Sequence, residues 1–203
     1  RRGRRMAPVP TAVKQAAMEL GIPVSEEVKD SLSVRADCGV VVAYGRLIER
    51  SVLAQLPMIN LHFSLLPRWR GAAPVERAIL AGDTETGVCI MALEPELDTG
   101  PIYRSREIKV SDDVTAQDLM EQLAKLGAEE LVAAIKEGLD QPLPQTGTAT
   151  VAAKIHRSDL ELDWKLSAVE LDRIVRVGGA WTTNSSSLLK IHKTRVVDGS
   201  GEA

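Results

Sequence analysis

The chain has 203 residues, of which 44% are apolar, so it is long enough for one large core or two smaller domains. No apolar run approaches the roughly 18 residues of a membrane helix, and no secretory signal pattern occurs. We therefore expect a cytoplasmic protein without a membrane partner. We also expect a monomer. Cys38 and Cys89 lack CxxC spacing and a neighbouring histidine, which argues against a zinc site and a disulfide scaffold.

The net charge of -3 is unevenly distributed, because four of the first five residues are arginine. Without these four the chain has 21 basic and 28 acidic residues, a balance of -7. A basic arm on an acidic body favours an anionic partner such as the phosphates of a nucleic acid. A solvated terminus is the alternative explanation of the charge alone.

The first half of the chain alternates between predicted helices and strands. Apolar spacing, with Thr11 as N-cap and Gly21 after the last turn, predicts a helix over 12–20. The β-branched run 39–43 predicts a strand covered on both faces. A helix over 46–53 and a strand over 58–63 follow.

The pattern continues to residue 138. Pro74 suits the first turn of a helix that ends at Gly82, and residues 86–93 are typical of a strand. Thr115 and Asp118 mark the start of a long amphipathic helix. Together these elements predict an α/β fold with a mostly parallel, Rossmann-like sheet, whose ligands bind beyond the carboxyl ends of the strands. Neither GxGxxG nor GxxxxGK[ST] occurs, so no dinucleotide or phosphate loop is expected.

A second, smaller unit follows this domain of residues 1–139. Residues 140–150 are rich in Pro, Gln, Gly and Thr without periodicity, which predicts an interdomain linker over residues 140–156. In residues 157–203, Ser167 and Glu170 form a capping box before a helix, and residues 188–197 alternate as in a strand. So short a segment buries little core, so this domain is expected to be small and incomplete.

Three polar residues suggest an active site. Asn60 and His62 lie two residues apart in a predicted strand, so their side chains share one face. Asp98 can complete the set, giving an amide that donates to an oxyanion, a group that titrates near neutrality and a carboxylate to orient it. Taken alone, His62 is explained as a buried histidine, Asn60 as the cap of a turn and Asp98 as part of a turn. Only their joint occurrence favours catalysis.

Residues 64–74, SLLPRWRGAAP, resemble the signature of the methionyl-tRNA formyltransferase family. The resemblance extends from residues 3–5 through 40–45, 60–74, 82–90 and 97–100 to Leu162-Asp163-Trp164. It implies transfer of a formyl group from 10-formyltetrahydrofolate to the α-amino group of methionine on initiator tRNA, in translation initiation. No metal ion is implied.

The resemblance also implies a role for each matching residue. The catalytic residues are Asn60, His62 and Asp98. Contacts with the folate co-substrate fall on Val41, Val42, Ala43, Tyr44, Gly45, Ser64, Leu65, Leu66, Pro67, Glu96, Leu97, Thr99 and Gly100. Contacts with the acceptor arm of tRNA fall on Arg2, Arg4 and Arg5. Because the nucleophile is the amine itself, Ser64 is not expected to attack.

The sequence also departs from the family pattern. The family's first sheet strand is absent before Arg1, and its C-terminal domain, which resembles an OB-fold barrel, is only partly present. We expect a fragment, or separate segments joined together.

Two alternative functions remain open. The nearest is that of another folate-dependent formyltransferase, acting on glycinamide ribonucleotide or an amino sugar nucleotide, and the second is that of a noncatalytic RNA-binding module. Trp69 is expected either to stack on a substrate or to anchor its loop.

Overall fold

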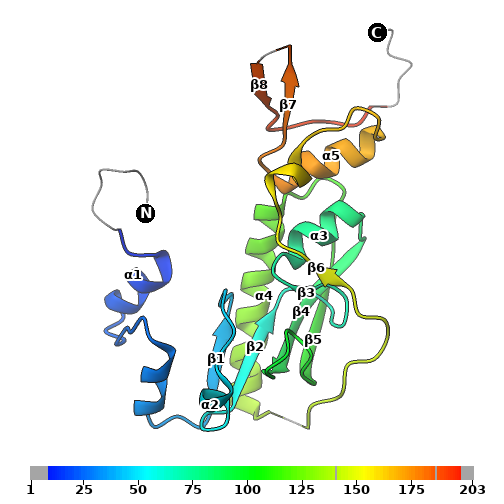
Figure 1. Cartoon of the computed structure of the whole chain (residues 1–203). Coiled ribbons are helices and arrows are strands. Elements are labelled where there is room, and N and C mark those ends of the chain that lie inside the picture. The colour runs from blue at the N-terminus through cyan, green and yellow to red at the C-terminus, as the bar shows by residue number, and fades with distance from the viewer. Residues whose placement is uncertain (1–8, 140, 186, 198–203) are drawn as a thin grey trace.

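A four-stranded sheet with one long helix against it forms the body of the structure (Figure 1). The computed structural model describes residues 9–139, 141–185 and 187–197. In the sheet the strands follow the order β1 (Gly39–Val42), β2 (Met58–His62), β4 (Glu85–Ala92) and β5 (Ile102–Lys109). The predicted α/β fold is confirmed.

The strand directions differ along this sheet. β1 and β2 pair in parallel, as expected, whereas β2–β4 and β4–β5 pair antiparallel. The loop 93–101 returns the chain directly alongside β4, and so short a connection permits only an antiparallel neighbour. β5 itself had no counterpart among the predicted strands.

Helix α4 (Ala116–Glu137) covers one face of the sheet and forms most of the core. The Thr115 hydroxyl caps its first turn by accepting from the Asp118 N–H, as predicted. Leu119 and Leu123 are fully buried against β2 and β4. A Cβ on Gly127 would lie 2.7 Å from a methyl of Leu61, so the glycine lets helix and strand approach closely.

The N-terminal elements lie beside the β1 edge of the sheet (Figure 1). They are α1 (Ala12–Glu19), which Thr11 caps as predicted, the 3-10 helix η1 (Val28–Ser33) and α2 (Arg50–Leu53), which is shorter than the predicted helix. The prediction that both faces of β1 are covered is wrong, because Val40 and Val42 are 44% and 47% exposed. The face that carries Val41 packs against α2 and β2.

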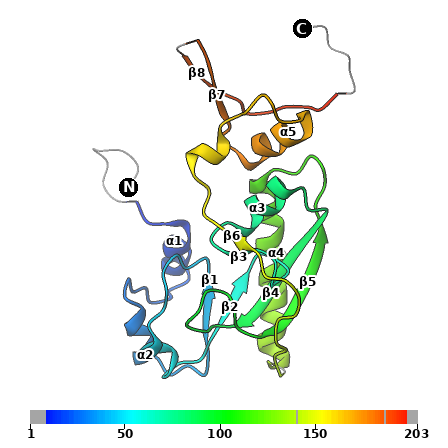
Figure 2. The same ribbon diagram turned by 45° about the vertical axis from the view of Figure 1, so that its right-hand side comes forward.

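The C-terminal elements lie at one end of the sheet, beside the helix that begins at Pro74 (Figure 2). Helix α3 (Pro74–Ala81) begins at the predicted proline, and helix α5 (Ala168–Val177) begins with the predicted capping box of Ser167 and Glu170. The 3-10 helix η2 (Arg157–Leu160) precedes α5, and the strands β7 (Trp181–Asn184) and β8 (Ser187–Lys190) follow it and form a hairpin. The predicted strand over 188–197 therefore ends at Lys190.

A short pair of strands joins the predicted linker to the body of the protein. β3 (Arg70–Gly71) runs parallel to β6 (Val151–Ala152), and Leu143 forms a bridge with Ile102 of β5. Backbone hydrogen bonds thus hold residues 150–152 along the signature loop and Leu143 against β5. Within the described ranges, no helix combines the length and apolar character that a membrane span requires, and no cluster of acidic, His and Cys side chains is arranged to hold a metal ion.

Candidate active site

Asn60 and His62 lie on the face of β2 that is turned away from α4. Both side chains are buried, whereas Leu61 between them points into the core. Among the described residues, none forms a hydrogen bond with the Asn60 amide group. The amide therefore remains available to donate a hydrogen bond to a ligand.

The imidazole of His62 is held between two oxygen atoms. Its Nε2 lies 2.8 Å from the carbonyl oxygen of Trp69, and its Nδ1 lies 3.7 Å from Oδ2 of Asp98. A carbonyl can only accept, so Nε2 carries a proton and Nδ1 is the nitrogen whose protonation can change. The 3.7 Å separation is an ion-pair distance when the ring is charged.

Asp98 comes from the loop between β4 and β5. Its side chain is buried, and Oδ2 accepts a hydrogen bond of 2.8 Å from the backbone N–H of Gly71. Its backbone is left-handed, with φ of +52°, a conformation that aspartate tolerates better than most residues. The structure thus brings the carboxylate of Asp98 to the imidazole of His62, on the strand face that also carries Asn60.

The turn of residues 64–68 shapes the end of β2. The buried Ser64 hydroxyl donates to the carbonyl of Arg68 at 2.6 Å, and the peptide bond between Leu66 and Pro67 is cis. Leu66 packs on Cys89 of β4. The side chains of Ser64 and Leu66 are therefore part of the protein interior. Burial also raises the pKa of the Cys89 thiol to about 11.

Trp69 anchors the signature loop, which is one of the two roles expected for it. Its indole N–H donates to Asp83 at 2.7 Å, and the guanidinium of Arg68, bonded to the same carboxylate, stacks 4.5 Å from the ring centre. A cavity of about 460 Å³ opens beside this group. Its lining does not include Asn60, His62 or Asp98.

The predicted folate-contacting residues lie in three places. Strand register sets Val41 opposite Asn60, and the following residues Val42, Ala43, Tyr44 and Gly45 are exposed. The turn contributes Ser64, Leu65, Leu66 and Pro67. In the Asp98 loop, Glu96 and Leu97 are exposed, Thr99 is half-buried and Gly100 is buried. The arginines Arg2, Arg4 and Arg5 lie outside the described residues.

Two residues of the predicted linker belong to the site and escaped the sequence analysis. Gln145 donates from Nε2 to the carbonyl oxygens of Asp98 and Gly100, at 2.9 and 2.8 Å. Thr150 accepts at Oγ1 from the Trp69 N–H at 2.9 Å. No local pattern marks them, because their partners lie 45 to 81 residues away in the chain.

Comparison with known proteins identifies the family. A family model described as formyl transferase matches residues 2–135. The methionyl-tRNA formyltransferase of Methylococcus capsulatus is 41% identical over 220 residues, covering 100% of this chain and 71% of the relative. The chain belongs to the methionyl-tRNA formyltransferase family. The family expected from the signature is therefore confirmed, and so is the prediction that the protein is a formyltransferase.

Several solved structures share this fold. Methionyl-tRNA formyltransferase from Clostridium thermocellum matches with a TM-score of 0.71 at 17% identity, over 89% of this chain and 82% of that one. HypX from Aquifex aeolicus in complex with tetrahydrofolic acid matches with a TM-score of 0.60 at 16% identity, over 73% of this chain and 27% of that one. At these identities the likeness concerns the fold alone.

Gly71→Ala should destabilise the site region. Gly71 has φ of +119°, and a Cβ there would lie 2.8 Å from the carbonyl oxygen of Ala152. We expect the free energy of unfolding to fall by about 1 to 3 kcal/mol, measured by urea denaturation. Gly45→Ala is the control, because a Cβ there meets no atom within 4 Å. Equal losses in the two variants would contradict this account.

Proposed function

We propose that this chain transfers the formyl group of 10-formyltetrahydrofolate to the α-amino group of methionine esterified to initiator tRNA. One observation carries the proposal: the His62 imidazole faces the Asp98 carboxylate, on the strand face that also carries the buried amide of Asn60. The family supports this reaction class, and the sequences of relatives named for methionyl-tRNA support this acceptor.

The reaction needs little beyond proximity and charge placement. The amine nitrogen bonds to the formyl carbon, the carbonyl becomes an oxyanion, and the bond from that carbon to the folate nitrogen then breaks. The amine loses one proton and the folate nitrogen gains one, so the transfer is balanced. No covalent intermediate with the protein is required, in keeping with the internal hydrogen bond of Ser64.

Asn60 and His62 have complementary roles in this proposal. The Asn60 amide donates to the developing oxyanion. His62 supplies a proton from Nδ1, because Nε2 is occupied by the Trp69 carbonyl. The carboxylate of Asp98, 3.7 Å from Nδ1, stabilises the positive charge of the protonated ring.

The folate co-substrate is proposed to bind along the carboxyl end of β1 and the Asp98 loop. Val41 is paired with Asn60 in the sheet, so a ligand beside residues 42–45 lies next to the amide. The exposed Leu97 offers apolar area to a ring system. In the turn of residues 64–68, Leu65 and Pro67 are proposed to contact the folate through their side chains. Ser64 and Leu66 are proposed to contact it through their backbone.

Formyl transfer to three acceptors tests the proposed substrate. With labelled 10-formyltetrahydrofolate, we expect labelled formylmethionyl-tRNA as the product, and no transfer to glycinamide ribonucleotide or an amino sugar nucleotide. Labelling of either small acceptor in preference to the tRNA would replace the acceptor proposed here. Binding of tRNA without any transfer would favour an RNA-binding module.

Asn60→Asp should lower kcat by a factor of roughly 10² to 10³, since one oxyanion donor is replaced by an acceptor of equal size. The KM for methionyl-tRNA should change little, because the amide is proposed to act on the transition state. Steady-state kinetics with both substrates varied checks this. An unchanged kcat would remove Asn60 from the chemistry.

The arginine arm is proposed to contact phosphates of the tRNA acceptor arm through Arg2, Arg4 and Arg5. Arg4→Ala should reduce the slope of log affinity against log salt by about one unit, because one phosphate contact is lost. Filter binding of methionyl-tRNA between low and moderate salt measures the slope. If the slope is unaltered, Arg4 makes no phosphate contact.

A further inference from the structure

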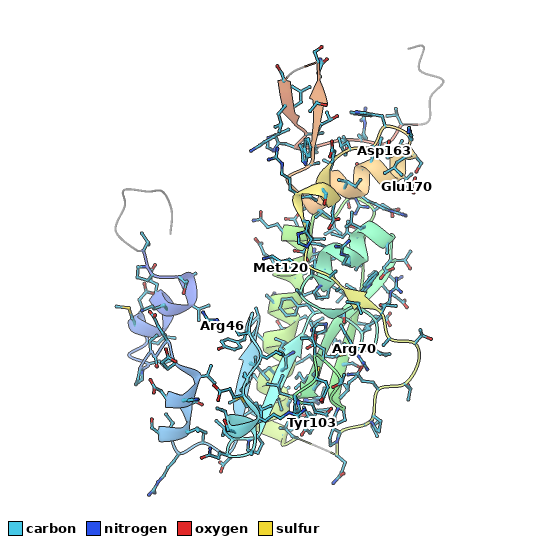
Figure 3. The ribbon with its side chains drawn as sticks, in the orientation of Figure 1. Arg46, Arg70, Tyr103, Met120, Asp163 and Glu170 are labelled. Atoms are coloured by element: carbon cyan, nitrogen blue, oxygen red, sulfur yellow. The ribbon has the colours of Figure 1, made fainter. Side chains whose placement is uncertain are left out.

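The side chain of Gln145 links the signature loop to the Asp98 loop. Its Nε2 donates to the carbonyls of Asp98 and Gly100, and its Oε1 accepts from Nε and Nη2 of Arg70, at 3.0 and 2.6 Å. Arg70 lies beside the loop that carries Gln145 (Figure 3). Both N–H groups of the amide and its oxygen are therefore engaged.

These bonds close a ring around the Asp98 carboxylate. Arg70 precedes Gly71, whose N–H binds Oδ2 of Asp98, while Gln145 binds the backbone oxygen of the same aspartate. The ring runs from Asp98 to Gly71, to Arg70, to Gln145 and back to Asp98. Backbone and side chain of Asp98 are thus held by two chain segments, although its φ of +52° is an uncommon conformation.

We propose that Gln145 is a positioning residue for Asp98, an inference that rests on the catalytic role proposed for Asp98. Within the described part of the chain, the side chain of Gln145 is hydrogen-bonded to Arg70, Asp98 and Gly100 and not to His62. It holds the carboxylate at its distance from Nδ1 of His62 by fixing the left-handed turn at residues 98–100.

The effect of Gln145 on catalysis should depend on the carboxylate of Asp98. Without the glutamine, two backbone carbonyls lose their donor and Arg70 loses its acceptor. The turn can then relax, and the carboxylate moves relative to the imidazole. Displacements of about 1 Å can cost on the order of 10²-fold in rate. A residue that only stabilised the fold would not make its effect depend on the charge of Asp98.

A double-mutant cycle tests this dependence. We expect Gln145→Ala to lower kcat by roughly 10- to 100-fold in the natural background and by less than about twofold in Asp98→Asn, because there is no carboxylate left to position. Gln141→Ala, an exposed glutamine of the same segment, should leave kcat unchanged. Equal losses in both backgrounds, or no loss at all, would overturn the proposal.

Gln145→Glu provides a second variant if the alanine variant does not fold. Its carboxylate keeps the acceptor for Arg70 but loses both donors to the 98–100 turn. The same dependence on Asp98 is expected for kcat, and natural kcat in Gln145→Glu would overturn the proposal.

Amide hydrogen exchange at Gly71 gives a readout that needs no activity. The acceptor of this N–H is Oδ2 of Asp98, so exchange should accelerate in Gln145→Ala and stay unchanged in Gln141→Ala. Unchanged exchange in Gln145→Ala would overturn the role of Gln145. If the natural protein transferred no formyl group, the proposed function would be wrong. The exchange measurement would still decide whether Gln145 holds the Asp98 loop in place.

Discussion

The hydrogen bond from the Gly71 N–H to the Asp98 carboxylate connects the parts from which the site is built. A buried carboxylate needs hydrogen-bond partners, and a bond to a charged group contributes about 1.5 to 3 kcal/mol. Here the partner is backbone of β3, which pairs with β6 and so couples the Asp98 loop to residues 143–152. The position of the carboxylate therefore depends on three chain segments that are far apart in sequence.

His62 is oriented by two residues with left-handed backbones, Trp69 with φ of +61° and Asp98 with φ of +52°. Such conformations cost roughly 1 to 3 kcal/mol each and persist where surrounding contacts hold them. Thr150 holds the Trp69 backbone, and Gln145 holds that of Asp98. One stretch of chain without regular structure thus fixes both oxygen atoms that flank the imidazole.

Local signals predicted local structure well. Thr115 and Ser167 cap the helices expected of them, and the alternation of a strand placed Asn60 and His62 on one face. The structure of residues 143–152 was unpredictable for a physical reason: their Thr-rich sequence has no periodicity, and their order comes from partners that only the folded chain brings near. The strand β5 and the exposed face of β1 depend likewise on neighbours that no local pattern specifies.

The hydrogen bond of the Trp69 carbonyl limits how protons can move in the proposed reaction. Because Nε2 must keep its proton to satisfy that carbonyl, every transfer through His62 uses Nδ1. A charged ring turns its Nδ1–H toward the carboxylate of Asp98, 3.7 Å away, so the imidazolium is the form that donates in the proposed reaction. The first proton step is then donation to the leaving folate nitrogen, either directly or by way of the oxyanion oxygen, whose proton passes to that nitrogen when the tetrahedral intermediate collapses. The lone pair exposed by that step can accept the proton of the amine, which returns His62 to its starting state without net exchange with solvent.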